Sequence, residues 1–238
     1  MRSIAMLGSA EQKASYLPQM ANCSLLCAFG LTEPAQGSDS IALETTAVRE
    51  GDEYVVNGQK TWTTLGQFGD WIFTLVRTDP SADKPQKGIS FLLIDMSSPG
   101  LTVRPIKLID GRHEVNEVFF DDVRVPADQL VGEENRGWDY AKFLLGNERT
   151  SAAPVGSIKA ALAAAKEHAK ATRSPHGTAL DEPLLAARFA QLEAEVMALE
   201  LTVLRVAGDS RDGRPDPASS ILKLRGSQLQ QDVYELMV

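Results

Sequence analysis

The sequence has few cysteines and few histidines. Cys23 and Cys27 are the only cysteines among 238 residues, and their spacing is neither that of a C-x-x-C redox pair nor that of half a zinc site. The three histidines, His113, His168 and His176, are scattered and form no metal-binding pair such as H-E-x-x-H. We therefore expect no metal cofactor, and we expect both cysteines to be small apolar side chains that stay reduced.

Long hydrophobic runs and an excess of positive charge are also missing. No stretch approaches the ~18 apolar residues that a membrane-spanning helix needs. The apolar run near the start, within residues 1–7, is too short for a signal peptide, so we expect a cytoplasmic protein. With 24 Lys and Arg against 32 Asp and Glu, the net charge is −8. This charge argues against nucleic acid as a partner, because such binding depends on neutralising phosphates.

The composition that remains is that of a globular protein, with 43% hydrophobic and 24% charged residues. The length allows one or two domains with a sizeable core. A helical segment over residues 10–16 is predicted to end near Pro18, since proline interrupts helical hydrogen bonding. From Phe29 to about Pro126, segments rich in β-branched and aromatic residues predict strands at 45–49, 54–56, 71–78, 89–95, 101–104 and 115–120.

Two glycine-containing pairs inside this region predict hairpin turns. They are Gly51-Asp52 and Asn57-Gly58, and an Asn-Gly pair accepts the positive φ that a type I′ turn requires. Short strands separated by such turns favour a small antiparallel barrel or sandwich.

From Gly137 onward the hydrophobic period becomes helical. One apolar face recurs at three- and four-residue spacing from Val155 to Ala169, and a second runs from Leu185 to Val206. Asp216-Pro217 resembles an N-cap followed by proline at the first helical position, which predicts a third helix towards Val238. Apolar helix faces of this kind must be buried, which predicts an antiparallel helical bundle or packing against a partner subunit. The expected fold class is α+β: the end of a helical segment, an antiparallel β-barrel and then a helical bundle.

Two segments of the β region carry side chains suited to a polar aromatic cofactor. Residues 29–39 form a Gly- and Pro-containing loop in which Thr32, Gly37 and Ser38 offer hydroxyls and closely spaced N–H groups. Residues 57–64 place Trp62 beside threonines, which gives a flat apolar surface next to hydroxyl donors. Taken singly, each segment is more often a plain turn or a barrel tryptophan. Neither is the G-x-G-x-x-G of a Rossmann site.

In this order, the two segments resemble the acyl-CoA dehydrogenase family of flavoproteins. The middle β domain of that family carries a T-E-P-x-x-G-S-D loop and, further along, a G-x-K-x-W-x-T strand. Here they read Thr32-Glu-Pro-Ala-Gln-Gly-Ser-Asp39 and Gly58-Gln-Lys-Thr-Trp-Thr-Thr64. The resemblance continues at 87–94, 119–126, 130–132, 137–138 and 147–149, so it covers nearly the whole chain.

The resemblance implies a domain plan. Residues 1–28 match the remnant of an N-terminal helical domain, residues 29–130 a middle β-barrel domain that binds flavin and acyl-CoA, and residues 131–238 an incomplete C-terminal helical bundle. Members of the family have a complete helical domain before the barrel and further helices after it. We therefore expect a fragment of a longer protein, and a short subunit completed by a partner chain is the alternative.

The resemblance also implies FAD as the cofactor. Positions that match the family's flavin contacts are Phe29, Leu31, Thr32, Gly37, Ser38, Trp62, Thr63, Thr64 and Arg173. Among them, Trp62 matches the residue that packs on the isoalloxazine ring. Arg173 matches an arginine that reaches the FAD of a neighbouring subunit, which implies a homo- or hetero-oligomer, a dimer or tetramer formed through the C-terminal helices. His176 and Leu184 depart from the family pattern near that contact.

The reaction implied is the removal of two hydrogens across the Cα–Cβ bond of an acyl-CoA thioester, which yields a trans-2-enoyl-CoA. Electrons then pass to an electron-transferring flavoprotein. Ser38 and Arg149 match substrate contacts, at the thioester arm and the CoA end respectively. A carboxylate must take the α proton. Glu148, in a Glu-Arg pair on the first helix after the barrel, matches one of the family's two base positions and is the predicted catalytic base, although such a pair also occurs on ordinary helix surfaces.

Two other functions remain open on the sequence. An acyl-CoA oxidase or another flavin enzyme of the same fold would consume oxygen. A non-catalytic subunit or inactive fragment would pack against helical partners and bind no flavin. A flavin absorbance spectrum separates the first possibility from the second.

Overall fold

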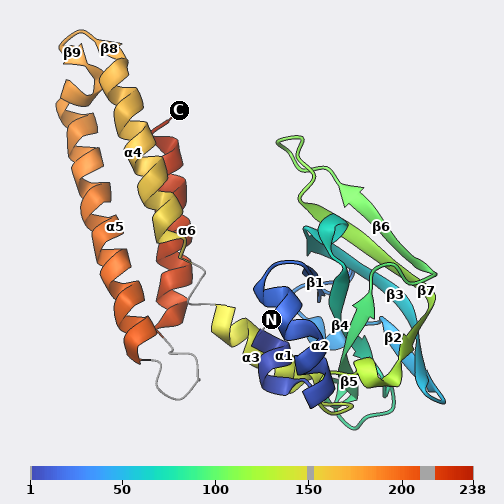
Figure 1. The fold of residues 1–238 in the computed structure, drawn as a ribbon. Coiled ribbons are helices and arrows are strands. Elements are labelled where there is room, and N and C mark those ends of the chain that lie inside the picture. The colour runs from blue at the N-terminus through green and yellow to red at the C-terminus, as the bar shows by residue number, and fades with distance from the viewer. Residues whose placement is uncertain (1, 149–152, 210–217, 238) are drawn as a thin grey trace. The chain divides into compact units, whose positions relative to one another are not determined.

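The computed structural model describes residues 2–148, 153–209 and 218–237. The chain divides into two compact units, residues 1–144 and 145–238, and the division falls inside helix α3 (Gly137–Glu148). The first unit is built on a seven-stranded sheet, whereas the described part of the second is helical with one short hairpin (Figure 1). The α+β class predicted from the sequence is confirmed.

The sheet of the first unit is curled and mixed. Its hydrogen-bonded order is β1-β4-β2-β3-β7-β6, and β5 also pairs with β4. Neighbouring strands are antiparallel, except that β1 and β2 run parallel to β4. The strands are β1 (Cys27–Gly30), β2 (Thr46–Glu50), β3 (Glu53–Thr64), β4 (Trp71–Arg77), β5 (Ile89–Asp95), β6 (Leu101–Ile106) and β7 (Val115–Pro126). The sequence did not predict β1, which is short and gains its place only by pairing with β4, so the sheet is mixed rather than antiparallel throughout.

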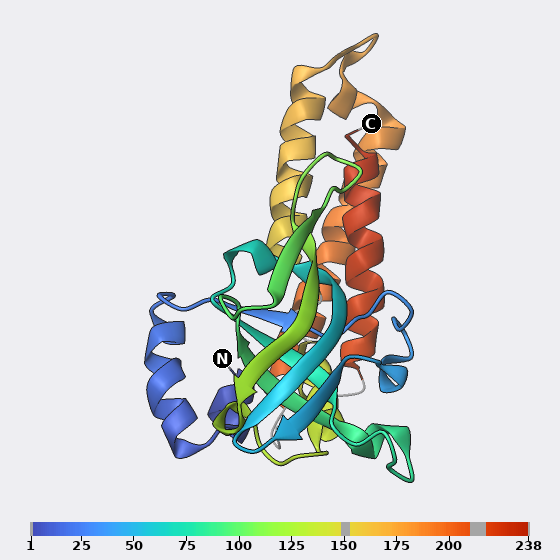
Figure 2. The same ribbon diagram turned by 90° about the vertical axis from the view of Figure 1, so that its right-hand side faces the viewer.

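Strands β3 and β7 are much longer than predicted and lie side by side along the sheet (Figure 2). The turn predicted at Gly51-Asp52 is confirmed, because it joins β2 to β3. The turn predicted at Asn57-Gly58 is wrong: both residues lie inside β3, at a register shift against β7. Gly58 has φ +144°, and a Cβ there would lie 2.7 Å from the Cα of Thr45, which directly precedes β2. Gly58 therefore lies in a β-bulge that another backbone segment approaches closely, and a bulge, like a turn, accommodates a glycine with positive φ.

The N-terminal segment contains α1 (Arg2–Leu7) and α2 (Ala10–Ala21). The predicted end near Pro18 is wrong, because α2 continues for three residues beyond it. Proline lacks one helical N–H, but Tyr16 and Met20 on either side of it are buried, and their packing holds the last turn in place. A capping box between Ser9 and Gln12 begins the helix.

Two hydrophobic clusters form the core of this unit. One joins α1 and α2 and the start of α3 to one face of the sheet, with Phe73 and Leu75 of β4 as members. The other contains Ile72 and Val76 of the same strand and joins β3, β5 and β7. Side chains on the two faces of β4 thus belong to different clusters, as expected for a strand that is buried on both faces. Short 3-10 turns connect the strands at η1 (Ser40–Ala42), η2 (Gly66–Phe68), η3 (Pro85–Gly88) and η4 (Ala127–Gln129).

The second unit contains α4 (Val155–Ala171), α5 (Pro183–Asp209) and α6 (Ser219–Glu235), together with the small strands β8 (Arg173–Ser174) and β9 (Gly177–Thr178) and the turn η5 (Ala179–Asp181). Its core contains the apolar positions predicted on the first two helices, including Ile158, Leu162, Leu192 and Val196. The predicted N-cap at Asp216-Pro217 lies outside the described residues. No helix in the described ranges is long and apolar enough to span a membrane.

Candidate functional site

The structure brings the two predicted motif segments together. The backbone N–H of Thr61 on β3 donates to the carbonyl of Thr32 at 2.8 Å. The ammonium of Lys60 also lies 3.4 Å from the carbonyl oxygen of Leu31. The loop that follows β1 is therefore attached to β3 immediately before Trp62, although the sequence separates these segments by about thirty residues.

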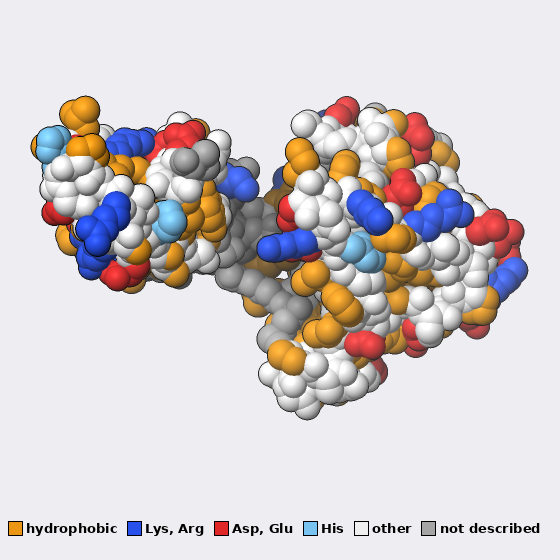
Figure 3. All heavy atoms as spheres, turned by 90° about the horizontal axis from the view of Figure 1, so that it is seen from above, with side chains coloured by type: hydrophobic (Ala, Val, Ile, Leu, Met, Phe, Trp, Pro, Cys, Tyr) orange, Lys and Arg blue, Asp and Glu red, His pale blue; other side chains and the backbone are white. Residues whose placement is uncertain are grey.

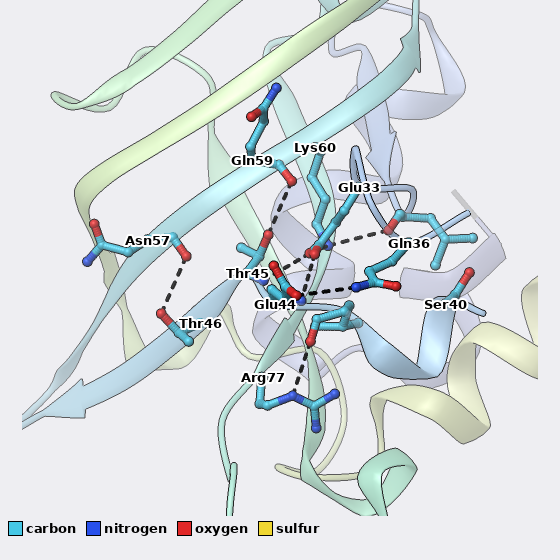
Figure 4. Close-up of polar contacts among 12 residues, drawn as sticks. Glu33, Gln36, Ser40, Glu44, Thr45, Thr46, Asn57, Gln59, Lys60 and Arg77 are labelled. Atoms are coloured by element: carbon cyan, nitrogen blue, oxygen red, sulfur yellow. Dashed lines mark hydrogen bonds and ion pairs between the residues drawn. The ribbon is translucent and has the colours of Figure 1, made fainter. Parts of the chain in front are cut away.

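A buried ion pair joins the same two segments. Lys60 Nζ and Glu33 Oε1 are 2.7 Å apart, and their side chains are 0% and 5% exposed (Figure 4). The Glu33 carboxylate also accepts the backbone N–H groups of Glu44 at 2.6 Å and Thr45 at 3.0 Å. Sequence reasoning included both charged residues in the motifs but assigned them no role. The available signal was weak, because Lys60 lies among polar and apolar residues of β3, and a lysine needs a charged partner only once it is buried.

Both members of this pair have shifted acid–base properties. Burial lowers the pKa of Lys60 to about 8, because it disfavours the charged ammonium, and the charge of Glu33 opposes that shift. For Glu33, burial alone would raise the pKa, but the Lys60 charge and the hydrogen bonds from Lys60, Thr45 and Glu44 outweigh it and lower the pKa. Both groups are therefore charged at neutral pH.

The aliphatic part of Lys60 reaches Glu33 by passing over a glycine. A Cβ built on Gly30, at the end of β1, would lie 3.2 Å from Lys60 Cγ and 3.0 Å from Ile72 Cδ1. A larger residue at this position would require the Lys60 and Ile72 side chains to shift by a few tenths of an ångström. Gly30 thus packs closely against the lysine, directly before the predicted cofactor loop.

Trp62 is held in an unusual backbone conformation. Its φ is +59°, in the left-handed region that a bulky residue rarely adopts, at a cost of about 1–3 kcal/mol. The residue lies in a second register shift of β3, between Lys60 and Thr63, where pairing with β7 is interrupted. Trp62 is 56% exposed, between the buried Thr61 and Thr63. Strain of this kind persists only where neighbouring structure enforces it.

Several hydroxyls of the two motif segments lack partners among the described residues. The hydroxyls of Thr32, Ser38 and Thr64 make no hydrogen bond with any described residue, and Ser38 and Thr64 are exposed. Thr63 differs, because its side chain is only 1% exposed and its hydroxyl is buried without a partner among the described residues. An exposed indole and free hydroxyls on two joined segments are side chains that suit a flavin, which presents an aromatic face and a polar edge.

The remaining predicted loop residues have mixed placements. The ring of Phe29 contacts the ring of Phe91 edge-on at 6.2 Å, so it faces the helix side of the core. Leu31 packs against the same core cluster. Gly37 is exposed, its carbonyl accepts the Ser40 hydroxyl at 2.9 Å, and a Cβ on it would meet nothing within 4 Å. Phe29 and Leu31 are both half-buried, so their side chains are partly committed to the core.

A basic cavity of about 610 Å³ lies elsewhere in the first unit. Its lining comes from the loop before β5 and from the start of α3, and it comprises Lys84, Gln86, Lys87, Asn135, Arg136, Trp138, Asp139 and Lys142. Asp139 pairs with both Arg136 and Lys142, at 2.9 Å each, whereas Lys84 has no ion-pair partner among the described residues. Lys87 also pairs with Asp83, so three of the four lining cations have a carboxylate partner, and Lys84 is the lining cation that would pair with an anionic ligand such as a phosphate.

One arginine connects this cavity to the loop that carries Ser38. The Arg77 guanidinium donates to the carbonyls of Ile41 at 2.7 Å, Leu43 at 3.1 Å and Pro85 at 2.9 Å. Pro85 lies between Lys84 and Lys87, two of the lysines that line the cavity. The free Ser38 hydroxyl and the basic cavity therefore belong to neighbouring loops.

The other predicted residues are less well defined. The backbone of Glu148 ends α3, but its side chain lies outside the described residues, as does Arg149 entirely. Arg173 is exposed on β8 of the second unit and makes no side-chain hydrogen bond or ion pair with a described residue. Within the described ranges, no group of three or more His, Cys, Asp or Glu side chains is arranged to hold a metal ion.

Comparison with known proteins gives matches along the chain. Residues 28–123 match the family described as acyl-CoA dehydrogenase, middle domain, and residues 135–238 match acyl-CoA dehydrogenase, C-terminal domain. Acyl-CoA dehydrogenase FadE26 of Mycobacterium tuberculosis is 35% identical over 243 residues, covering 99% of this chain and 60% of that protein.

Solved structures agree with these matches. The acyl-CoA dehydrogenase from Geobacillus kaustophilus has a TM-score of 0.92 at 32% identity and covers 99% of this chain and 64% of its own. The ChsE4-ChsE5 complex from Mycobacterium tuberculosis has a TM-score of 0.88 at 36% identity, covering 99% and 61%. This chain spans about 60% of the length of the relatives named here. With both domain matches, the two joined motifs and the curled mixed sheet, the chain belongs to the acyl-CoA dehydrogenase family.

Proposed function

We propose that the protein containing this chain is an FAD-dependent acyl-CoA dehydrogenase that converts an acyl-CoA thioester to its trans-2-enoyl-CoA and passes the electrons to an electron-transferring flavoprotein. The observation that carries the proposal is Trp62, a strained and exposed tryptophan beside unpaired hydroxyls. The buried Glu33–Lys60 pair supports it, because it fixes the loop of Thr32 against the strand of Trp62.

The cofactor contacts follow from this arrangement. The indole of Trp62 would pack on the flavin ring, and the hydroxyls of Thr32, Ser38 and Thr64 would donate to its polar edge and phosphates. Leu31 and Gly37 would offer backbone groups to the same ligand. FAD, when bound, supplies a two-electron acceptor for the hydride that leaves Cβ of the substrate.

The chain's own residues would bind the substrate and take its α proton. Ser38 would contact the thioester arm, and Arg149 the CoA end of the substrate. Glu148 would take the α proton, and the electron pair of the Cα–H bond would then form the Cα–Cβ double bond. The electron pair of the Cβ–H bond would leave with the hydride. In a site closed to water, burial would raise the pKa of that carboxylate towards that of the α proton and make the transfer easier.

The basic cavity supports a substrate that carries phosphates. Its free Lys84 and its aromatic Trp138 suit the charged and planar parts of a nucleotide, and Arg77 ties the adjoining loop to the segment of Ser38. A CoA thioester has a thioester at one end and a phosphorylated adenosine at the other. Both ends would therefore have a matching environment on the first unit.

Exposed apolar side chains support assembly through the C-terminal helices. Hydrophobic side chains lie on the surface of both units (Figure 3), and the second unit exposes Met197, Leu201 and Leu204 on α5 and Ile221 and Leu224 on α6, each by more than half. The printed title of the ChsE4-ChsE5 structure names a complex of two proteins. We infer a homo- or hetero-oligomer, in which Arg173 reaches the FAD of the neighbouring subunit.

The test is a flavin titration of the purified protein, followed by gel filtration and a visible absorbance spectrum. We expect the Trp62→Ala, Thr64→Ala double variant to bind FAD roughly 10- to 100-fold more weakly, since it loses a stacked ring and a hydrogen bond of about 0.5–1.5 kcal/mol each. Trp71→Phe, a change at another tryptophan of the same unit, is the matched control. Undiminished flavin in the double variant would contradict the site. Oxygen consumption with acyl-CoA in place of transfer to an artificial acceptor would indicate an oxidase.

A further inference from the structure

A buried asparagine lies directly behind the bulge that exposes Trp62. Asn116, near the start of β7, is 0% exposed. Its Nδ2 donates to the carbonyl of Thr63 at 3.0 Å and to Gln67 Oε1 at 2.7 Å, and its Oδ1 lies 2.6 Å from His113 Nε2. One amide thus joins β3, the η2 turn and the β6–β7 connection.

The orientation of this amide is determined by its partners. The Thr63 carbonyl only accepts, and Gln67 presents Oε1 because its own Nε2 donates to the carbonyl of His113 at 3.0 Å. The two hydrogens of Asn116 Nδ2 are therefore both used, and Oδ1 accepts from His113 Nε2, which must carry a proton. Every polar atom of the Asn116 side chain has a partner, so the bridge fixes all three segments at once.

The Asn116 side chain lies at the end of the β3 bulge that contains Trp62. Trp62 lies between Thr61, whose N–H is bound by Thr32 on the loop side, and Thr63, whose carbonyl is bound by Asn116. The Thr63 hydroxyl takes no part, since it has no partner among the described residues. Pairing between β3 and β7 resumes at Thr63 and Asn116 themselves. The backbone is thus held one peptide group before and one peptide group after those that flank Trp62, which restrains a bulky residue at φ +59°.

We propose that Asn116 is a positioning residue for Trp62: it holds the bulge of β3 in the conformation that aims the indole ring outward, towards the flavin. The role of this conformation in flavin binding rests on the proposed function, whereas the effect of Asn116 on Trp62 does not. Asn116 touches neither cofactor nor substrate in this role. It acts only through the Thr63 carbonyl.

The chain offers a matched control at the other bulge of the same strand. Asn57 also bridges β3 to β7, through two 2.9 Å hydrogen bonds with Asp122, beside the register shift at Gly58. Asn57→Ala and Asn116→Ala therefore remove the same side chain from the same strand pair, and only the second adjoins Trp62.

The test uses the full chain with Trp71→Phe and Trp138→Phe, so that Trp62 is the only fluorophore of its kind. We expect Asn116→Ala to lower the fluorescence anisotropy and near-ultraviolet circular dichroism of Trp62, while Asn57→Ala leaves both unchanged. With all tryptophans restored, the FAD dissociation constant should rise about tenfold in Asn116→Ala, which corresponds to 1.4 kcal/mol. Secondary structure and urea unfolding show that each variant is folded.

The outcomes separate the two claims. Unchanged Trp62 anisotropy and circular dichroism in folded Asn116→Ala would overturn the positioning role, whatever happens to flavin. A changed Trp62 signal in a protein that never binds FAD would support the positioning role and contradict the proposed function. If Asn116→Ala does not fold, Gln67→Ala replaces it, because it removes one restraint on the Asn116 amide from a half-buried position. The same loss of Trp62 order is then expected, and its absence would overturn the proposal.

Discussion

Replacing Glu33 with glutamine tests whether the buried ion pair holds the two motif segments together. Glutamine keeps the shape of the side chain but removes the charge that faces Lys60 at 2.7 Å. It also sets a donor NH₂ where the carboxylate now accepts two backbone N–H groups. Removing one member of a fully buried pair costs about 3–5 kcal/mol, because the other charge stays buried without a partner. Since domains are stable by only about 5–15 kcal/mol, the first unit should lose a large part of its stability.

Urea unfolding followed by tryptophan fluorescence measures this loss selectively. All three tryptophans, at positions 62, 71 and 138, belong to the first unit, so the signal does not report on the helical unit. The control is Asp83→Asn, which removes the partner of Lys87 from an ion pair whose side chains are 65% and 59% exposed. Such surface pairs contribute about 0–1 kcal/mol.

A double variant completes the experiment. Glu33→Gln combined with Lys60→Met leaves no unpaired charge, so its loss of stability should be clearly smaller than the sum of the two single losses. A loss below about 1 kcal/mol for Glu33→Gln, similar to that of Asp83→Asn, would show that the pair is not the buried constraint inferred here. Strict additivity in the double variant would refute the coupling between the two side chains.

Three further predictions concern pH, catalysis and substrate binding. Because folding lowers the pKa of Glu33, this carboxylate stabilises the fold above its ordinary pKa near 4.5, and the stabilisation is lost as pH falls through the folded pKa. Folding also lowers the pKa of Lys60 from 10.5 to about 8. Between about pH 8 and 10.5 the unfolded chain therefore binds more protons than the folded one, so the free energy of unfolding rises with pH there. Acid and alkaline unfolding series should show both slopes, and the alkaline one should vanish in Lys60→Met. Glu148→Gln should lower turnover about 10²–10⁴-fold with flavin retained, measured with an artificial electron acceptor, and unchanged turnover would assign the α-proton base to another residue. Lys84→Ala should raise KM for acyl-CoA with little change in kcat, and an equal KM would exclude the basic cavity from substrate binding.

Local sequence patterns determined much of this protein. The spacing of apolar residues predicted α4 and α5 together with their buried faces, because a helix repeats every 3.6 residues whatever surrounds it. The turn at Gly51-Asp52 and most strand positions followed from turn chemistry and β-branched composition. The order of the T-E-P and G-x-K-x-W motifs indicated the family before any contact was known.

Tertiary structure decided how these pieces function. An Asn-Gly pair tolerates positive φ equally in a turn and in a bulge, and only pairing with β7 placed Asn57-Gly58 inside a strand. The partner of Lys60 is 27 residues away, and the neighbours of Trp62 on β3 are also bound by residues distant in sequence: the Thr32 carbonyl accepts the Thr61 N–H, and the Asn116 amide donates to the Thr63 carbonyl. Strand register and buried pairing arise from long-range hydrogen bonding, which local propensity does not encode. The sequence shows that a tryptophan is present at position 62, but its exposure is a property of the folded sheet.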